Sequence, residues 1–198
     1  MLSLILFILP GGSQNISILK SEITIEGVSF DLLFSGDEIE KKIREMGEAF
    51  AARSGEKLYT MVPVMTGALY FSARFLSYLD FPYRVFSVSA ESYDGLTSTG
   101  EVNIYFPKDL TWLEGADVII LEYIVETGLT IRRLESFFYA HGAQSVSVIT
   151  LFYKPERLQY DCPVREYGFS IGDEFIVGYG MDYHEQGRWL QAVYQRTS

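Results

Sequence analysis

The sequence predicts an α/β fold built on a parallel β-sheet. Apolar runs of strand length alternate along the chain with segments whose apolar residues recur at helical spacing. This alternation is typical of βαβ units, in which helices cover a parallel sheet. The clearest strand is 118–121, an unbroken apolar run that is too short for a buried helix. Two strand-to-helix turns, 65–68 and 126–130, should lie at the carboxyl edge of the sheet, where ligands collect.

Composition indicates a single domain, 1–198, in the cytoplasm. A chain of 198 residues is long enough for one substantial domain, and no repeat or linker divides it. The net charge of −10 argues against non-specific binding to nucleic acid or to an anionic membrane. A lone cysteine, Cys162, excludes an internal disulfide and makes a reducing compartment the expected one.

The first nine residues are strongly apolar. They are too few to span a bilayer as a helix, and no Lys or Arg precedes Lys20. We therefore predict that 1–22 is a tail or an edge strand covering apolar surface, for instance at a subunit contact. A short export signal is the alternative.

The first half of the chain should be extended over 23–34 and then helical. Ser35, followed three residues later by Glu38, has the pattern of a capping box at the start of a helix. Apolar residues at helical spacing continue that helix to about 53–55. The next elements expected are a strand over 58–64, the turn 65–68 and a helix over 69–79.

The second half should add strands on either side of the central turn. Residues 83–90 are β-branched and aromatic and predict a strand, and 102–106 should be extended again. The polar, glycine-bearing segment between them is typical of a mobile hairpin. After Thr130, a helix should run to Gly142, which suits a C-terminal cap, and 145–153 predicts the next strand.

The stretch 117–130 places carboxylates, hydroxyls and a glycine between a strand and a helix. Glu122 ends the apolar run, and Glu126 opens the turn. Loop amides and the helix N-terminus offer donors to an anion, and Thr127 and Thr130 add hydroxyls. The glutamates could hold ribose hydroxyls, a magnesium ion or a proton in transit. On these residues alone, a capped helix with solvated glutamates is an equally good interpretation.

This stretch resembles the phosphoribosyl-diphosphate (PRPP) binding motif of the type I phosphoribosyltransferases, and residues 30–190 resemble their hypoxanthine-guanine branch. The resemblance implies a parallel sheet flanked by helices, a small hood and a flexible closing loop. It also implies that Glu122 holds ribose hydroxyls, that Glu126 is the general base, and that the loop cradles the 5′-phosphate. The implied PRPP-binding residues are Glu122, Tyr123, Glu126, Thr127, Gly128, Leu129 and Thr130.

Two further loops match functional segments of that family. The turn containing Thr66 and Gly67 matches the pyrophosphate loop, which often has a non-proline cis peptide before the position of Thr66; a plain tight turn is the alternative. Arg188 matches an arginine aimed at pyrophosphate. Ser92 and Tyr93 match the closing loop, a lid that excludes water during chemistry, although a solvated hairpin would have the same composition.

The purine side of the site is implied by Lys154 and by the block 167–183. The lysine would donate to the 6-oxo group of the purine, whereas its ordinary interpretation is a solvated surface charge. Phe175 matches the ring that stacks on the purine, and Ile176 the residue whose backbone meets the 2-position; without the resemblance, both indicate core. The implied purine-binding residues are Lys154, Phe175, Ile176 and Asp182, and the implied magnesium ligands are Glu122 and Asp182.

The resemblance predicts a magnesium-dependent purine salvage enzyme. It would join hypoxanthine or guanine to PRPP, giving a nucleoside monophosphate and pyrophosphate, and would act as a homodimer or homotetramer. Three positions depart from the family pattern: Tyr123 replaces a second acid, Glu126 replaces aspartate, and Thr66 stands where lysine is common. The departures leave two alternatives, a PRPP- or nucleotide-binding sensor with little turnover, or a subunit that only assembles with an active paralogue.

Overall fold

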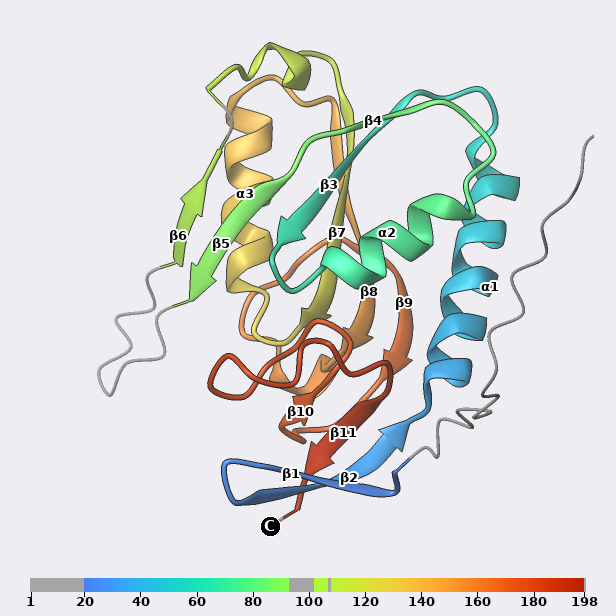
Figure 1. The fold of residues 1–198 in the computed structure, drawn as a ribbon. Helices are drawn as coiled ribbons and strands as arrows, with labels where there is room; N and C mark the ends of the chain where they lie inside the picture. Colours follow the sequence, from blue (N-terminus) through green and yellow to red (C-terminus); the bar gives the residue numbers. More distant parts are fainter. Residues whose placement is uncertain (1–19, 93–101, 107, 198) are drawn as a thin grey trace, which may run out of the picture.

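A computed structural model describes residues 20–92, 102–106 and 108–197, which form two β-sheets with helices on both faces of the larger one (Figure 1). The larger sheet has the order β6-β5-β3-β7-β8-β9, with β4 also paired to β3. Its pairings are parallel except that β6 runs antiparallel to β5. The strands are β3 (Tyr59–Met65), β4 (Tyr83–Val85), β5 (Val88–Ser92), β6 (Val102–Tyr105), β7 (Asp117–Val125), β8 (Ser145–Tyr153) and β9 (Val164–Ser170). The helices are α1 (Gly36–Ser54), α2 (Leu69–Ser77) and α3 (Leu129–Ala140), with short 3₁₀ turns η1 (Thr111–Leu113) and η2 (Pro155–Arg157).

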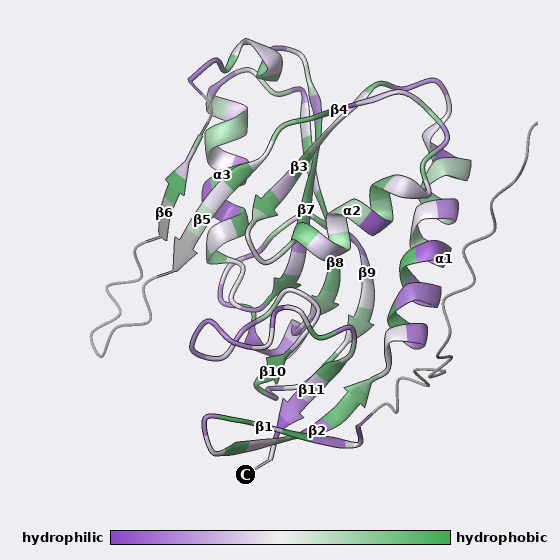
Figure 2. Cartoon of the chain, in the orientation of Figure 1, coloured by the Kyte–Doolittle hydropathy of each residue, from purple (hydrophilic) through white to green (hydrophobic). Residues whose placement is uncertain are grey.

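The central strand β7 is buried on both faces, which explains its unbroken apolar run. Ile119 and Leu121 pack into the cluster beneath α1 and α2. Their neighbours Val118 and Ile120 pack into the cluster beneath α3. Successive side chains of a strand point to opposite faces, so this one run supplies both halves of the core. Figure 2 shows the resulting apolar strands and the hydrophilic residues along α1.

A second sheet, the hood, covers the carboxyl ends of the main strands (Figure 1). It is antiparallel, with the order β1-β2-β11-β10. Ile176 and Val193 from the hood belong to the same apolar cluster as α1 and α2, so the hood packs onto the core on that face of the main sheet. A separate apolar cluster that includes Phe30 and Tyr194 lies within the hood. The hood strands are β1 (Glu22–Ile25), β2 (Val28–Phe34), β10 (Ile176–Val177) and β11 (Val193–Arg196).

The predicted capping box at the start of α1 is confirmed. The Ser35 hydroxyl accepts the Glu38 N–H at 3.3 Å, and the Ser35 N–H donates to the Glu38 carboxylate at 2.9 Å. The helix ends at Ser54, and Gly55 follows with a φ of +58°. A local motif was sufficient here because both halves of the box lie within one turn.

Two predicted segments are divided in the structure. The extended segment 23–34 is a hairpin that turns at Glu26 and Gly27, with φ values of +49° and +80°. Positive φ at both positions is typical of a two-residue hairpin turn. The strand predicted over 83–90 is broken between β4 and β5 at Phe86, whose ring stacks on Trp112 at 4.4 Å between centroids.

Two other predictions need correction at strand ends. Glu122 does not end the central strand but lies inside β7, opposite Thr150 of β8. β11 was not predicted, because Val193–Arg196 has no apolar run and gains its strand partners from distant parts of the chain. Residues 1–19, most of the predicted N-terminal tail, lie outside the described residues. Across the described ranges, no helix combines the length and apolar character needed to cross a membrane.

Candidate active site

The turn from β7 into α3 forms the predicted phosphate loop. Gly128 occupies the helix N-cap with a φ of +79°, and a Cβ there would lie 2.6 Å from the Tyr160 carbonyl oxygen. Glycine is therefore required both for its backbone conformation and for the close approach. The Thr127 hydroxyl accepts the Leu129 N–H at 3.3 Å, and the Thr127 carbonyl accepts two amides from 159–160. The first turn of α3 has no acidic residue, so its N-terminus is suited to an anion.

Glu122 turns back on its own backbone. One carboxylate oxygen accepts the Tyr123 N–H at 2.9 Å, and the side chain is 5% exposed. Burial raises the pKa of Glu122 to about 8, despite the opposing effect of hydrogen bonds from the Tyr123 and Ile124 amides. This carboxyl is therefore largely protonated at neutral pH.

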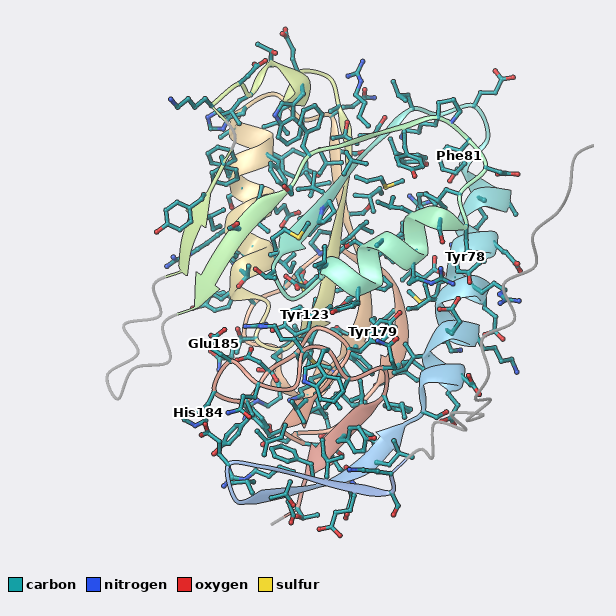
Figure 3. The ribbon with its side chains drawn as sticks, viewed as in Figure 1. Tyr78, Phe81, Tyr123, Tyr179, His184 and Glu185 are labelled. Carbon is teal, nitrogen blue, oxygen red and sulfur yellow. The ribbon has the colours of Figure 1, made fainter. Side chains whose placement is uncertain are left out.

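Tyr123 leans across to the predicted pyrophosphate loop between β3 and α2. A Cβ added at Gly67 would lie only 2.2 Å and 2.4 Å from two ring carbons of Tyr123. Burial raises the pKa of the Tyr123 phenol above its ordinary range, and the nearby carboxylates of Glu122 and Glu126 add to this effect. The phenol is neutral in this setting. Figure 3 places Tyr123 at the boundary between the main sheet and the hood.

The pyrophosphate loop has the predicted cis peptide, between Met65 and Thr66. On its other side the loop meets the hood. A Cβ placed on Gly180, whose φ is +102°, would lie 2.3 Å from the Gly67 carbonyl oxygen. The backbone of Gly67 is thus enclosed by the Tyr123 ring and by the hood turn at Gly180.

Asp182 and Arg188 form an ion pair in the hood, at 2.7 Å between Arg188 Nη2 and Asp182 Oδ1. Arg188 also donates to the Gly180 carbonyl oxygen at 2.9 Å, and Asp182 accepts the Glu185 N–H at 2.9 Å. The arginine is therefore fixed beside the turn that contacts the pyrophosphate loop. Both side chains remain partly exposed, so an anionic ligand can still reach them.

Lys154 is buried at the carboxyl end of β8, with a side chain 5% exposed. Its ammonium is paired with the Glu126 carboxylate and donates to the Glu174 carbonyl oxygen at 2.8 Å. This is not the solvated surface charge that is the usual role of a lysine. An ammonium has three donors, so one more acceptor can be bound.

Phe175 and Ile176 lie near this lysine in space, because they directly follow Glu174, whose carbonyl oxygen accepts from Lys154. Ile176 is buried in β10, whereas the Phe175 ring is 46% exposed. The ring makes an edge contact with Tyr183, at 5.8 Å between centroids, and lies tilted against Phe30 at 6.5 Å. An exposed aromatic ring is suited to stacking on a planar ligand.

The predicted closing loop is only partly described. Ser92 is the last residue of β5 and pairs with Val102 of β6, so a β-hairpin opens here as expected. Tyr93 lies outside the described residues. The hairpin is on the β3 side of the sheet, next to the pyrophosphate loop.

Two contributors to the site had weak sequence signals. Gly180 makes the close contact with Gly67, and only the pattern Gly178-Tyr179-Gly180 could have indicated a tight backbone approach. Glu174 contributes through its backbone carbonyl, which any residue would supply.

The two predicted magnesium ligands differ in their fit to a metal ion. Glu122 is 5% exposed and one of its carboxylate oxygens accepts the Tyr123 N–H, which makes it a poor ligand. Asp182 is ionisable and partly exposed, but is paired with Arg188. Within the described residues, no group of three or more His, Cys, Asp or Glu side chains could hold a metal.

Comparison with known proteins relates this chain to enzymes of one kind. A model of the phosphoribosyl transferase domain matches residues 31–184. The hypoxanthine-guanine phosphoribosyltransferase of Bacillus subtilis (strain 168) is 36% identical over 164 residues, covering 82% of this chain and 90% of that protein. The hypoxanthine-guanine-xanthine phosphoribosyltransferase of Tritrichomonas foetus is 35% identical over 164 residues, covering 82% and 88%.

Solved structures agree with these sequence matches. A hypoxanthine-guanine phosphoribosyltransferase from Bacillus anthracis superposes with a TM-score of 0.76 at 31% identity, covering 83% of this chain and 97% of that one. A hypoxanthine phosphoribosyltransferase from Staphylococcus aureus superposes with a TM-score of 0.76 at 29% identity, covering 84% and 91%. The predicted fold, with its parallel sheet, flanking helices and hood, is confirmed.

Proposed function

This chain belongs to the phosphoribosyl transferase domain family, and from that premise we propose that it is a purine salvage enzyme. It joins hypoxanthine or guanine to PRPP, and the products are a nucleoside monophosphate and pyrophosphate. The names of its relatives support this activity. They do not favour the alternative of a nucleotide sensor with little turnover.

The buried ammonium of Lys154 is the observation that best supports a 6-oxopurine. Hypoxanthine and guanine present a carbonyl oxygen at this position, which accepts from an ammonium, whereas adenine presents an amino group. The exposed ring of Phe175 lies next to Glu174, which accepts a hydrogen bond from Lys154. A purine stacked on that ring could therefore direct its 6-oxo group at the lysine.

The remaining residues bind different parts of PRPP or accept a proton from the purine. Thr127 to Thr130 hold the 5′-phosphate at the start of α3, and the pyrophosphate group lies between the Gly67 loop and Arg188. Positive charge develops on the ribose as pyrophosphate leaves, so catalysis rests on alignment and electrostatics. Glu126 receives a proton from the purine. The Glu126 carboxylate is 42% exposed and paired with Lys154, which supports a place beside the purine.

Magnesium fits this proposal through the substrate. A magnesium ion is commonly held by one or two carboxylates together with substrate phosphates, and it keeps several waters. Asp182 is the carboxylate that would contribute, once its pairing with Arg188 is loosened. The ion would neutralise charge on the pyrophosphate group. Glu122 acts on the ribose side as a hydrogen-bonding group.

We further propose that residues 1–198 work as one cytoplasmic domain that assembles into homodimers or homotetramers. The shared apolar cluster between hood and main sheet supports one domain. The lone Cys162 supports a reducing compartment.

The test is pyrophosphate release from PRPP and magnesium with hypoxanthine, guanine, xanthine or adenine supplied separately. We expect release with hypoxanthine or guanine, little release with adenine, and release reduced about 10- to 100-fold in Lys154→Met. If folded protein binds a nucleoside monophosphate but releases no pyrophosphate with any base, the proposed enzymatic activity is refuted. The nucleotide-binding sensor is then the better interpretation.

A further inference from the structure

The residue at position 123 contacts the pyrophosphate loop through its ring. Gly67 has no space for even a methyl group, because a Cβ would come within 2.2 Å of Tyr123 Cε1, 2.4 Å of Cδ1 and 3.0 Å of Cζ. Real Cβ atoms do not approach other atoms so closely, so the ring lies directly against the Gly67 backbone. This contact joins the central strand to a loop that follows a different strand.

The same loop makes a second close contact, with the hood. The Gly67 carbonyl oxygen lies against Gly180, where a Cβ would be only 2.3 Å away. Gly180 is itself bound at both ends to Arg188, through Gly180 N–H to the Arg188 carbonyl at 3.0 Å and Arg188 Nη1 to the Gly180 carbonyl at 2.9 Å. Gly67 is therefore in close contact both with the Tyr123 ring and with the hood turn at Gly180.

We propose that Tyr123 is a positioning residue, whose ring holds the Gly67 loop in the shape that binds the pyrophosphate group of PRPP. The inference rests on the proposed function. Tyr123 does not substitute for a carboxylate, since a phenol has a single hydroxyl and cannot offer two acceptor oxygens. Thr66, the neighbour of Gly67, carries no charge for pyrophosphate, so the loop depends on its amides being correctly placed. The ring supplies that placement by contact.

Three substitutions in the full-length protein separate the ring from the hydroxyl. Tyr123→Phe keeps the ring, Tyr123→Leu removes it, and Tyr123→Asp introduces the acid. KM is measured for PRPP and hypoxanthine in the forward reaction and for pyrophosphate in the reverse reaction with inosine monophosphate. Tyr59→Leu is the matched control, because Tyr59 is a buried tyrosine at the opposite end of β3.

We expect Tyr123→Phe to keep all three KM values within about twofold, since packing is retained. Tyr123→Leu and Tyr123→Asp should raise KM for PRPP and for pyrophosphate about tenfold, equivalent to about 1.4 kcal/mol, and leave KM for hypoxanthine nearly unchanged. Tyr59→Leu should lower the melting temperature but should not raise KM for PRPP and pyrophosphate relative to KM for hypoxanthine.

Several outcomes would overturn the inference. They are a Phe variant as impaired as the Leu variant, an Asp variant more active than wild type, or an equal rise in all three KM values. If wild type shows no turnover, the proposed function fails separately. The affinity of the same variants for PRPP, measured by calorimetry, then decides: equal affinities in wild type and Tyr123→Leu refute the positioning role.

Discussion

Replacing Glu122 with glutamine should change how stability depends on pH. Burial raises the pKa of this carboxyl from an ordinary 4.5 to about 8. Between these pH values the folded protein keeps a proton that the unfolded chain has released. The free energy of unfolding therefore falls as pH rises through this interval, and the contribution is fully present only below the unfolded pKa. Glutamine cannot ionise, so the free energy of unfolding of Glu122→Gln does not fall in this way as pH rises.

The magnitude follows from the size of the pKa change. A rise from 4.5 to about 8, at about 1.4 kcal/mol per pKa unit, gives a ceiling of about 5 kcal/mol at alkaline pH. Relaxation and water entry around an ionised carboxylate reduce this penalty, so we expect about 2–3 kcal/mol. For a domain of this length that is a difference of about 5–10 °C in melting temperature.

The assay is thermal melting of ligand-free wild type and Glu122→Gln between about pH 5 and pH 9. The two melting temperatures should be similar at the acidic end, and the variant should be the more stable at the alkaline end. The exposed Glu156→Gln is the control and should show no such divergence. A difference between wild type and Glu122→Gln that stays constant across the range would refute the assigned burial and protonation of Glu122.

Three further predictions follow from local contacts. Lys154→Met removes the donor shared by Glu126 and the Glu174 carbonyl, so kcat/KM with hypoxanthine, measured by pyrophosphate release, should fall about 10- to 100-fold. Gly67→Ala should cost about 1–3 kcal/mol in urea unfolding, and less in a Tyr123→Ala background; additive costs would disprove the contact. Ser35→Ala should cost about 1 kcal/mol in the same assay with unchanged activity, because it removes only the cap of α1.

Predictions from the sequence succeeded where the signal was local. The capping box at Ser35 and the two strand-to-helix turns are encoded within a few residues each. The end of β7 was placed too early because Glu122 is polar, and nothing near it in sequence shows that tertiary packing buries a carboxyl there. The strand β11 was missed for a related reason, since its partners β2 and β10 are distant or very short.

In the candidate site, too, local motifs were predictable from the sequence and tertiary contacts were not. Motifs identified which residues gather at the carboxyl edge of the sheet, but not which of them touch. The contact between Tyr123 and Gly67 depends on the direction of one side chain across two strands, and the pairing of Lys154 with Glu126 depends on side-chain length. Neither is encoded in the spacing of residues along the chain. The exposed Phe175 and the buried Ile176 are likewise adjacent in sequence but face opposite environments.

The topology of the hood determines the order in which the two sheets can fold during translation. β11 is the strand that joins β2, from the beginning of the chain, to β10, and it consists of Val193–Arg196 near the C-terminus. A nascent chain can assemble the main sheet while translation continues, since domains form progressively as they are synthesised. The hood cannot close until Val193–Arg196 has left the ribosome, because this strand joins β2 to β10. The proposed purine-binding side of the site, which includes Ile176 of β10, is therefore completed after the main sheet.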